Sequence, residues 1–523
     1  MVEFENEFTW GNAVSQNTVD KFHDLFEKAI KQVKSNFGKK YPMIINGKKI
    51  FSDDCFKVRS PADTNLVLAE FPNCTEENVL DAANSAKAAF YKWSVIPYQD
   101  RVKIFCNCAD AMSKQKFYLA ASMTFENGKN RIEAMNDVDE AIDFLRFYSY
   151  QLEKNEGFCK KTPHPNPREK TMTVLKPYGV WGIIAPFNFP SAIAIGMTTG
   201  ALITGNTAVL KPASATPLSS YFFVENLFEH VPAGTINFVT GSGSVVGKSL
   251  VENPNIEGIA FTGSRDVGVA GAKKFTEKNP KPFIAEMGGK NPVIVTKNAD
   301  LEKAAEGVMR AAFGYGGQKC SACSRVYVQK EILNEFTEKI LEKTKSLKIG
   351  KPWLQDSFLG PVINKEAVDK FERSVEMAKK DGKIIFGGNI LKNSDYDSGF
   401  FVEPTIVTNL PKNHKLITEE LFLPFLCIDT YDDFDDAIDL ANNTEYGLTA
   451  GIFSEDKQQI DEFFKKIQAG TVYANRASSA TTAALVQAQP FVGWKASGTT
   501  GKGAGGENYL QQFLRAQTQT LCD

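Results

Sequence analysis

The feature that most limits the fold is a series of short, nearly continuous apolar segments that begins at Val180. Helical stretches such as 216–230 and 264–277 separate these segments. Apolar strands that alternate with helices are typical of a parallel sheet that helices cover on both faces. The segments that we expect to form strands are VWGIIAPF at 180–187, TAVLKP at 207–212, INFVTG at 236–241, IEGIAFTG at 256–263 and PFIAEMGG at 282–289.

The same alternation resumes after a break near residue 288. A chain of 523 residues has room for two or three domains. We therefore expect an α/β protein with two α/β domains in series. In the second domain we expect a strand at 324–329, helices at 331–346 and 366–381, and further strands near 383, 402, 425, 449 and 471.

The part of the chain before Val180 has a different texture. Apolar residues recur at helical spacing at 18–37, 77–93 and 99–122, so we expect this first stretch to be mostly helical. The segment 160–177 contains the closely spaced prolines Pro163, Pro165 and Pro167 and then alternates, which is typical of a loop and an exposed hairpin.

Charge and composition give no argument for a nucleic-acid or membrane partner. The formal net charge of −2 gives no general attraction to phosphate backbones or anionic lipids. No apolar run reaches the roughly 18 residues that a membrane helix needs. The first residues, MVEFENEFTW, lack the pattern of a secretion signal. We expect a cytoplasmic protein that binds neither nucleic acid nor membrane. Its nine scattered cysteines and four separated histidines favour neither a disulfide framework nor a metal site.

Two cysteines, Cys320 and Cys323, lie in the glycine-rich turn FGYGGQKCSACSR at 313–325. Zinc needs four ligands, and the only other close pair, CNC at 106–108, has the wrong spacing. A thioredoxin-like pair would open a helix after a strand, whereas this pair follows a helix and precedes a strand. The motif alone leaves two alternatives open, a nucleophile or a buried cysteine.

Three polar residues at predicted strand ends are further candidates for a site. Glu286 ends a strand before Gly-Gly, and Asn188 follows a strand in the turn APFNFP. Lys211 also ends a strand, and the carboxyl ends of parallel strands line the ligand crevice of such sheets. Each residue has an ordinary alternative: a solvated carboxylate, a turn asparagine or a surface charge.

Two glycine-containing turns are weaker candidates for a phosphate site. GSGSVVG at 241–247 misses the GxGxxG pattern by one residue, and FTGSRDVG at 261–268 places Gly263 and Ser264 between a strand and a helix. Backbone N–H groups at the start of a helix can hold a phosphate. Either turn is equally compatible with an ordinary connection from strand to helix.

Taken together, these motifs resemble the aldehyde dehydrogenase superfamily in type, order and spacing over nearly the whole chain. The motifs are Asn188, Lys211, FTGS at 261–264, Glu286 in EMGGK, GQKC at 317–320 and EELFLPF at 419–425. Further segments resemble the 1-pyrroline-5-carboxylate dehydrogenase branch, whose members oxidise glutamate γ-semialdehyde to glutamate in proline degradation. These segments are KKYPMIINGKKI at 39–50, QKCSACSR at 318–325, NNTEYGLTAGIFS at 442–454 and the segment 489–514.

The resemblance implies the aldehyde dehydrogenase fold and a division into domains. Residues 1–159 and 178–288 would form a Rossmann-like NAD(P)-binding domain, and residues 289–490 an α/β catalytic domain. The segments 160–177 and 506–523 would be oligomerisation elements. An exposed hairpin and an apolar tail are usually buried by a partner, so we expect a homo-oligomer, a dimer or higher.

The resemblance also implies catalytic roles. Cys320 would be the nucleophile, and Cys323 would be a small buried hydrophobic residue. The Asn188 amide and the Cys320 N–H would hold the developing oxyanion. Glu286 would be the general base that activates water against the thioester. A member without activity, serving as a binding protein, is the alternative from another class.

On the cofactor side, the resemblance implies that Lys211 binds the adenosine ribose. Gly263 and Ser264 would face the pyrophosphate, while Glu420 would hold the nicotinamide ribose with Phe422 near the ring. Ser214 stands where NAD-specific relatives often have a glutamate. We therefore expect NAD as the cofactor, with NADP possible.

The substrate residues implied by the resemblance lie partly in the loop 477–491. Phe189 and Phe491 would enclose the aliphatic part of the substrate, and Ser321 would contact it. Ala483 and Ala484 stand where the branch has a glycine–alanine step that binds the substrate's α-carboxylate.

Besides Ala483, the chain departs from the family pattern at three further glycines, which are Gln487, Leu423 and Val492 here. The catalytic groups are complete, but the substrate anchor is altered. Another semialdehyde or an apolar aldehyde is therefore the alternative substrate.

Overall fold

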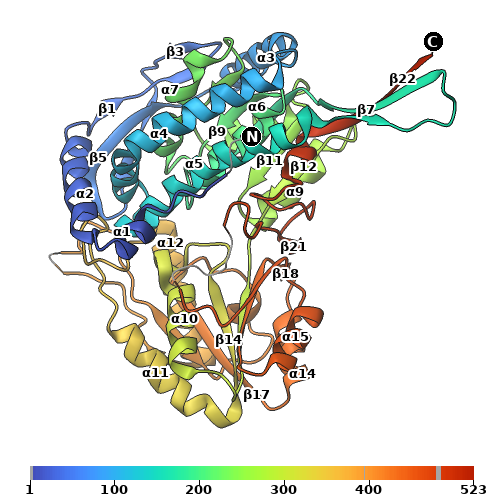
Figure 1. Ribbon diagram of the computed structural model, residues 1–523. Coiled ribbons are helices and arrows are strands. Elements are labelled where there is room, and N and C mark those ends of the chain that lie inside the picture. Colours follow the sequence, from blue (N-terminus) through green and yellow to red (C-terminus); the bar gives the residue numbers. More distant parts are fainter. Residues whose placement is uncertain (1–3, 394, 479–484, 523) are drawn as a thin grey trace.

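The computed structural model describes residues 4–393, 395–478 and 485–522, and two seven-stranded sheets lie one above the other in it (Figure 1). One sheet is built from strands before residue 288 and the other from strands after it. The predicted α/β class is confirmed. The domain boundaries given above stay a prediction.

The first sheet has five parallel strands in the order β12-β11-β8-β9-β10. Helices α6 (Ala192–Ile203), α7 (Pro217–Leu227) and α9 (Arg265–Phe275) connect them. The register pairs Ile184 with Lys211 and Thr262 with Glu286, so both candidate residues lie at the carboxyl edge of the sheet. The strands are β8 (Val180–Ile184), β9 (Thr207–Lys211), β10 (Ile236–Phe238), β11 (Gly258–Thr262) and β12 (Phe283–Glu286).

The second sheet has the order β15-β16-β17-β14-β13-β19-β20, with only the edge strand β15 antiparallel. Its strands are β13 (Asn291–Val295), β14 (Cys323–Gln329), β15 (Lys383–Phe386), β16 (Thr405–Thr408), β17 (Phe425–Tyr431), β19 (Thr449–Phe453) and β20 (Thr471–Ala474). Its main helices are α10 (Leu301–Phe313), α11 (Leu333–Lys345), α12 (Lys365–Asp381), α14 (Phe434–Asn442) and α15 (Lys457–Lys466).

The expectation of a mostly helical first stretch is wrong between residues 39 and 72. Helices do occur on both sides: α1 (Thr9–Ser15), α2 (Val19–Lys34), α3 (Glu76–Trp93), α4 (Tyr98–Glu126) and α5 (Arg131–Lys154). Between them lie β1 (Lys39–Lys40), β2 (Met43–Ile45), β3 (Lys48–Ile50), β4 (Cys55–Ser60) and β5 (Asp63–Pro72).

The signal that the sequence offered for these strands is the Asn46–Gly47 step. Both residues have positive φ, 54° and 68°, as a two-residue hairpin turn requires. This turn pairs β2 with β3, and both extend the first sheet in antiparallel fashion. The strands are short, so alternation over so few residues gave little sign of them.

A third sheet projects from the body of the molecule at the right of Figure 1. Its strands β6 (Cys159–Thr162) and β7 (Glu169–Pro177) form the expected hairpin, and β22 (Leu514–Cys522) pairs antiparallel with β7. The two predicted oligomerisation segments therefore meet in one sheet. Their role in assembly stays a prediction.

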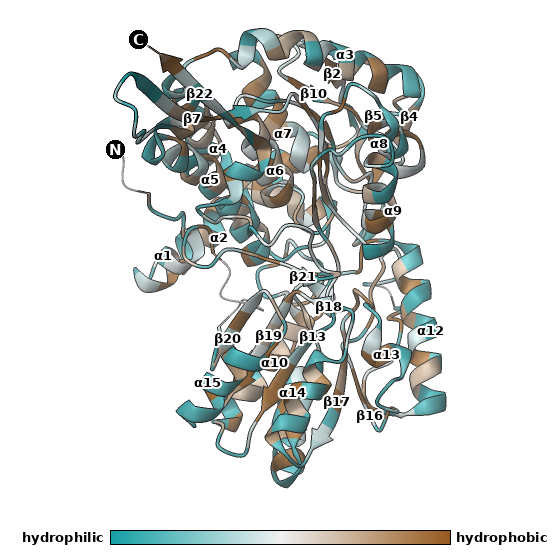
Figure 2. Cartoon of the chain, turned by 90° about the vertical axis from the view of Figure 1, so that its right-hand side faces the viewer, coloured by the Kyte–Doolittle hydropathy of each residue, from teal (hydrophilic) through white to brown (hydrophobic). Residues whose placement is uncertain are grey.

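The apolar residues gather inside the two large layers. Figure 2 shows hydrophobic strands between helices whose hydrophilic sides face outward. Among the described residues, none of the helices is both long and apolar enough to span a membrane.

Candidate active site

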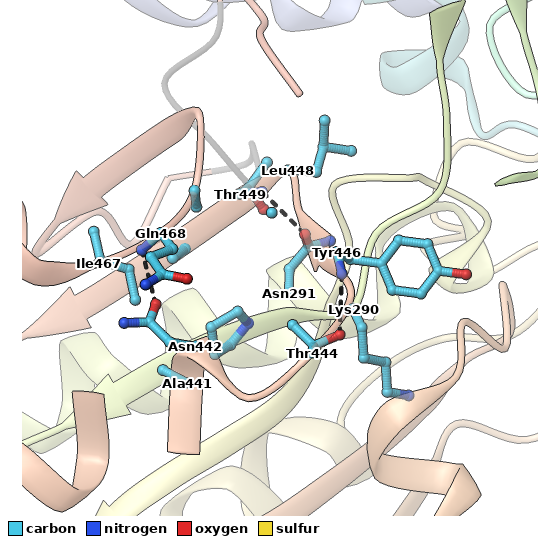
Figure 3. A pocket seen from close by; sticks show the side chains of 14 residues that line it. Lys290, Asn291, Ala441, Asn442, Thr444, Tyr446, Leu448, Thr449, Ile467 and Gln468 are labelled. Atoms are coloured by element: carbon cyan, nitrogen blue, oxygen red, sulfur yellow. Dashed lines mark hydrogen bonds between the residues drawn. The ribbon is translucent and has the colours of Figure 1, made fainter. Parts of the chain in front are cut away.

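Cys320 lies in a turn between the short helix η4 (Gly314–Gly317) and β14. Asn291, the first residue of β13, donates its Nδ2 to the carbonyl oxygen of Cys320 at 2.6 Å and to that of Ala322 at 2.9 Å. Its Oδ1 accepts the N–H of Thr449 at 3.0 Å (Figure 3). One amide therefore fixes the turn that carries Cys320 to two neighbouring strands.

The other side of this turn is held by Tyr315 and Gln318. The Tyr315 hydroxyl donates to the Asn127 carbonyl at 2.9 Å. Gln318 is fully buried; its Nε2 donates to the Pro361 carbonyl at 3.3 Å, and its Oε1 accepts the Ile363 N–H at 2.8 Å. The turn is thus tied to the α4–α5 connection and to the segment before α12.

Gly317 allows the turn to pass close to the segment after Glu420. Its φ is +66°, and a Cβ there would lie 2.1 Å from the Leu423 carbonyl oxygen. No side chain fits at that distance. Leu423 itself is buried in an apolar cluster with residues such as Val402 and Leu421. The leucine that replaces a family glycine therefore adds core packing at this point.

The environment of Cys320 keeps its sulfur protonated at rest. Burial raises the pKa of the Cys320 thiol, and the nearby carboxylates of Glu420 and Glu286 raise it further. The N–H groups of Ser321 and Cys320 point at the sulfur and oppose this rise. A proton must therefore leave the sulfur before it can attack a carbonyl carbon.

The two cysteines of the motif occupy different environments. Cys320 is half-buried in the turn, whereas Cys323 is buried at the start of β14 among apolar residues such as Val326 and Ala312. The Cys323 sulfhydryl donates to the Arg325 carbonyl at 3.5 Å. This difference favours Cys320 as the nucleophile, a role that stays a prediction.

Glu286 lies at the end of β12 and is bridged to Gly498. Its Oε2 is buried without a hydrogen-bond partner among the described residues. Burial raises the pKa of Glu286 to about 8, against the opposing N–H of Gly493. A carboxylate with a pKa near neutral and an open acceptor position is suited to take a proton from water.

Asn188 is buried in the turn after β8, where its Oδ1 accepts the Phe189 N–H at 3.1 Å. With the oxygen engaged in this way, the amide Nδ2 is the end left for a substrate oxygen. Asn127 steadies the same turn from the α4–α5 connection by donating to the Phe187 carbonyl at 3.4 Å.

A fully buried ion pair supports this turn from behind. Lys129 Nζ lies 2.8 Å from Asp137 Oδ2 and 3.4 Å from the centroid of the Phe189 ring. Asp137 also accepts the Ala192 N–H at 2.7 Å, at the start of α6. Sequence reasoning missed Lys129, Asp137 and Asn291. Lys129 lies in the segment ENGK and Asn291 directly follows EMGGK, so both could be seen in the sequence. Neither motif indicated which residues these side chains would contact.

The predicted cofactor residues follow the strands of the first sheet. Lys211 is buried at the end of β9, where its Nζ donates to the Pro212 carbonyl at 2.9 Å, and burial lowers its pKa to about 8. Ser214 Oγ donates to the Gly241 carbonyl at 2.7 Å. Ser264 is exposed at the N-cap of α9, and Gly263 before it donates its N–H to the Glu286 carbonyl at 3.2 Å.

Glu420 and Phe422 approach the same edge from the second sheet. Glu420 Oε1 accepts the Gly289 N–H at 2.9 Å, and a Cβ on Gly288 would lie 2.4 Å from Glu420 Oε2. Burial raises the pKa of Glu420. The Phe422 ring lies 5.7 Å from that of Phe187, edge to face.

These residues fit a dinucleotide. Lys211 is a buried ammonium group that donates to the Pro212 carbonyl, and an ammonium group has two further N–H groups to give. Ser264 opens a helix of 11 residues without using its hydroxyl as a cap, so the helix N-terminus is left for an anion. Glu420 has a carboxylate that could accept hydrogen bonds from ribose hydroxyls.

The predicted substrate residues are only partly described. Ser321 is buried, and its carbonyl accepts the Thr449 hydroxyl at 3.3 Å. Phe491 exchanges two main-chain hydrogen bonds of 3.0 Å with Ala504. Ala483 and Ala484 lie outside the described residues. Gln487, at one of the replaced glycines, has a positive φ of 73°.

A family profile described as the aldehyde dehydrogenase family matches residues 50–519. The chain is 38% identical over 507 residues to a 1-pyrroline-5-carboxylate dehydrogenase of Geobacillus sp. (strain WCH70), with 96% of each chain covered. It is also 38% identical over 508 residues to 1-pyrroline-5-carboxylate dehydrogenase 1 of Halalkalibacterium halodurans, again with 96% of each chain covered.

Solved structures give the same result. A 1-pyrroline-5-carboxylate dehydrogenase from Thermus with bound NAD superposes with a TM-score of 0.93 at 32% identity and covers 100% of both chains. A betaine aldehyde dehydrogenase from Staphylococcus aureus in complex with NAD⁺ superposes with a TM-score of 0.89 at 28% identity, covering 95% of this chain and 97% of that one.

Proposed function

The chain belongs to the aldehyde dehydrogenase family, and from this premise we propose that it oxidises glutamate γ-semialdehyde to glutamate, with NAD as hydride acceptor, in proline degradation. The observation that carries the proposal is the placement of half-buried Cys320 within electrostatic reach of Glu286, whose Oε2 has no described partner. The full-length likeness to enzymes named for this substrate supports the choice of aldehyde.

In the first half of the reaction, Cys320 loses its proton to solvent water, and its sulfur adds to the aldehyde carbon. The carbonyl oxygen gains negative charge, and the Asn188 Nδ2 and the Cys320 N–H donate to it. One such donor lowers the barrier by about 2.7–4 kcal/mol. Bound NAD supplies the acceptor for the hydride that leaves this carbon.

In the second half, Glu286 takes a proton from a water molecule that attacks the thioester carbon. The carbon–sulfur bond breaks, glutamate leaves, and Cys320 is regenerated. Because the pKa of Glu286 is about 8, the carboxyl group is mostly protonated at neutral pH and is ionised above that value.

The cofactor would be held across the edge of the first sheet. Lys211 would bind the adenosine ribose, the turn with Gly263 and Ser264 the pyrophosphate, and Glu420 the nicotinamide ribose with Phe422 near the ring. Ser214 neither repels nor strongly captures a 2′-phosphate, so use of NADP alongside NAD is part of the proposal.

Phe189, Phe491 and Ser321 would line the substrate channel, with Ala483 and Ala484 giving N–H groups to the α-carboxylate. A second candidate substrate is an uncharged aldehyde or another semialdehyde. It is favoured by Gln487, because a family glycine is absent where the backbone is left-handed.

The remaining proposals concern domains, assembly and location. Residues 1–159 and 178–288 would bind the cofactor, and 289–490 would carry the nucleophile. The sheet β22-β7-β6 exposes β22 as an unpaired edge, which supports a homo-oligomer built on this sheet. Light scattering that finds only a species of 57.8 kDa would contradict it. A cytoplasmic location is proposed from the nine free cysteines.

The test of the function is NADH absorbance on adding glutamate γ-semialdehyde or an uncharged aldehyde of similar length, with NAD or NADP. We expect the highest kcat/KM with glutamate γ-semialdehyde and NAD. A higher kcat/KM with the uncharged aldehyde would overturn the proposed substrate, and no NADH with any aldehyde would overturn the reaction.

A further inference from the structure

The first described residues form a strap along α5. We define the N-terminal strap as residues 4–9, which lead into α1 and include its first residue (Figure 2). The Glu7 N–H donates to Asp143 Oδ1 at 2.7 Å, and the N–H and hydroxyl of Thr9 donate to Asp139 at 2.8 Å each. The Phe4 ring packs edge to face on Phe147, with centroids 5.1 Å apart. The strap is therefore bound to one face of α5 along its length.

Hydrogen bonds to two buried carboxylates hold the strap on α5. Asp139 and Asp143 are buried carboxylates on α5, and the strap supplies N–H groups to both. Buried carboxylates that lose their donors are costly, so release of the strap is unfavourable. On its other side the Glu7 carboxylate pairs with Lys116 at 3.0 Å and with Arg146 at 2.7 Å.

Asn6 connects the strap to a distant loop. Its Nδ2 donates to Asp143 Oδ2 at 2.9 Å and to the Val486 carbonyl at 3.1 Å. A side-chain amide has two N–H groups, so both are used. Asn6 and Val486 are 480 residues apart in the sequence. A single amide therefore bridges α5 and the loop that follows β20.

The loop is held at its next residue as well. Val486 is buried, and the Gln487 N–H donates to the Gly505 carbonyl at 2.8 Å. Gly505 in turn donates its N–H to the Tyr148 hydroxyl, on α5, at 3.1 Å. These two supports lead to α5, one through Asn6 and one through Tyr148, while the Gln489 Nε2 ties the same loop to β20 by donating to the Val472 carbonyl at 3.0 Å. A left-handed non-glycine residue such as Gln487 persists where its surroundings over-determine the backbone.

From Gln487 the chain continues to Phe491, one of the proposed substrate residues. Leu485 and Gln489 exchange main-chain hydrogen bonds of 3.2 and 3.0 Å, and Phe491 pairs with Ala504. A shift at Val486 would therefore be passed along a short, tightly paired stretch to the Phe491 ring.

We propose that Asn6 is a positioning residue for the substrate: the strap fixes the loop 485–491 and thereby the place of Phe491. Among the described residues, Asn6 contacts neither Cys320 nor Glu286. It therefore acts on substrate binding and leaves the chemical step unchanged. This inference rests on the proposed function for the identity of the substrate.

The test compares Asn6→Ala with Thr9→Val. Both variants weaken docking of the strap, but only Asn6 contacts the loop. We expect Asn6→Ala to raise KM for glutamate γ-semialdehyde about tenfold, because a small misplacement of a substrate-positioning group has effects of this order. Its kcat and its KM for NAD should stay within about twofold. Thr9→Val should leave all three unchanged, and Asn6→Gln, which keeps both N–H groups, should restore part of the KM.

A second readout does not depend on the substrate. Hydrogen exchange of the Gln487 and Gln489 amides should be faster in Asn6→Ala than in the native protein and unchanged in Thr9→Val. If the native enzyme prefers another aldehyde, the proposed function fails, and exchange still tests the strap. Unchanged exchange and KM in Asn6→Ala, or equal changes in Thr9→Val, would overturn the inference.

Discussion

The turn that carries Cys320 and the loop 485–491 are held in different ways. Buried side chains of Asn291, Gln318 and Tyr315 fix the turn to four surrounding segments. The loop depends on main-chain pairing, on single bonds from Asn6 and from Gln489 to the Val472 carbonyl, and on Tyr148 only through Gly505. Buried, fully paired networks define one geometry, whereas a loop with few supports tolerates sequence change.

This difference accounts for one departure from the family pattern, at Gln487, but not for Leu423, which lies against the Cys320 turn. The residues of the proposed chemistry are all present, while the loop has Gln487 in place of a glycine. The reaction and the choice of aldehyde can therefore change separately. The predictions below test this separation, from the largest expected effect to the smallest.

Cys320→Ser should lower kcat for aldehyde oxidation by at least about 10³-fold, because a serine hydroxyl is far less ionised than a thiol. NAD affinity, measured by fluorescence titration, should stay within about twofold, since the residue lies outside the cofactor contacts. The matched control is Cys323→Ser, for which we expect a mild effect on activity. An inactive Cys323→Ser with an active Cys320→Ser would reverse the assignment of the nucleophile.

Glu286→Gln should slow the release of glutamate by about 10²–10⁴-fold, because an amide cannot take the proton of the attacking water. Rapid-mixing absorbance should show a burst of about one NADH per active site followed by a slow phase, as expected when acylation is intact and deacylation is slow. Loss of the burst itself would contradict the role as base in the second step.

The pH profile gives an independent check of Glu286. The base is active when deprotonated, and burial raises its pKa to about 8. Where deacylation limits turnover, kcat should therefore rise about tenfold per unit below that pH and level off above it. In Glu286→Gln this rise should disappear. A native profile that is flat from pH 6 to pH 9 would contradict the assignment.

Asn291→Ala should show how far the position of the Cys320 turn depends on one side-chain amide. Without its hydrogen bonds to the Cys320 and Ala322 carbonyls, the turn that carries Cys320 can shift. Because misplacement of a reacting group slows the reaction, we expect kcat to fall by about 10²-fold. KM for NAD should change little. Asn291→Asp is the control, since it keeps an acceptor for Thr449 but loses the donor to both carbonyls. Wild-type kcat in both variants would show that the turn is held without this residue.

Much of this architecture was predictable from local pattern. The strands of both sheets are apolar runs between helices, so β8, β9, β11, β14 and β17 were expected where they occur. The strands at 39–72 were missed because each is too short for a clear period, and only the Asn46–Gly47 step marked one of their turns. The α/β class follows from the longer pattern.

The supporting residues were not predictable, for a physical reason. Asn291 and Lys129 act through partners that are far away in the sequence, and Asn6 reaches Val486 across 480 residues. A local sequence pattern carries no information about such partners. The pKa of Glu286 likewise depends on burial, which only the assembled sheets determine. The motif alone also left Cys320 and Cys323 undecided, and their different burial now favours Cys320.

The smallest expected effect concerns Gln487 in the loop 485–491. Its left-handed backbone costs an L-residue roughly 1–2 kcal/mol, which glycine avoids. Glycine also loses about 0.5–1 kcal/mol through the entropy of the unfolded chain. Gln487→Gly should therefore increase the free energy of unfolding by about 0.5–1 kcal/mol, a Tm shift of about 1 °C for a chain of this length, measured by calorimetry. Gln487→Ala, which removes the exposed side chain but keeps the strain, should leave Tm unchanged. An equal rise in both variants would place the cost in the side chain, and a fall in Gln487→Gly would show that the strap and Gly505 do not hold this residue under strain.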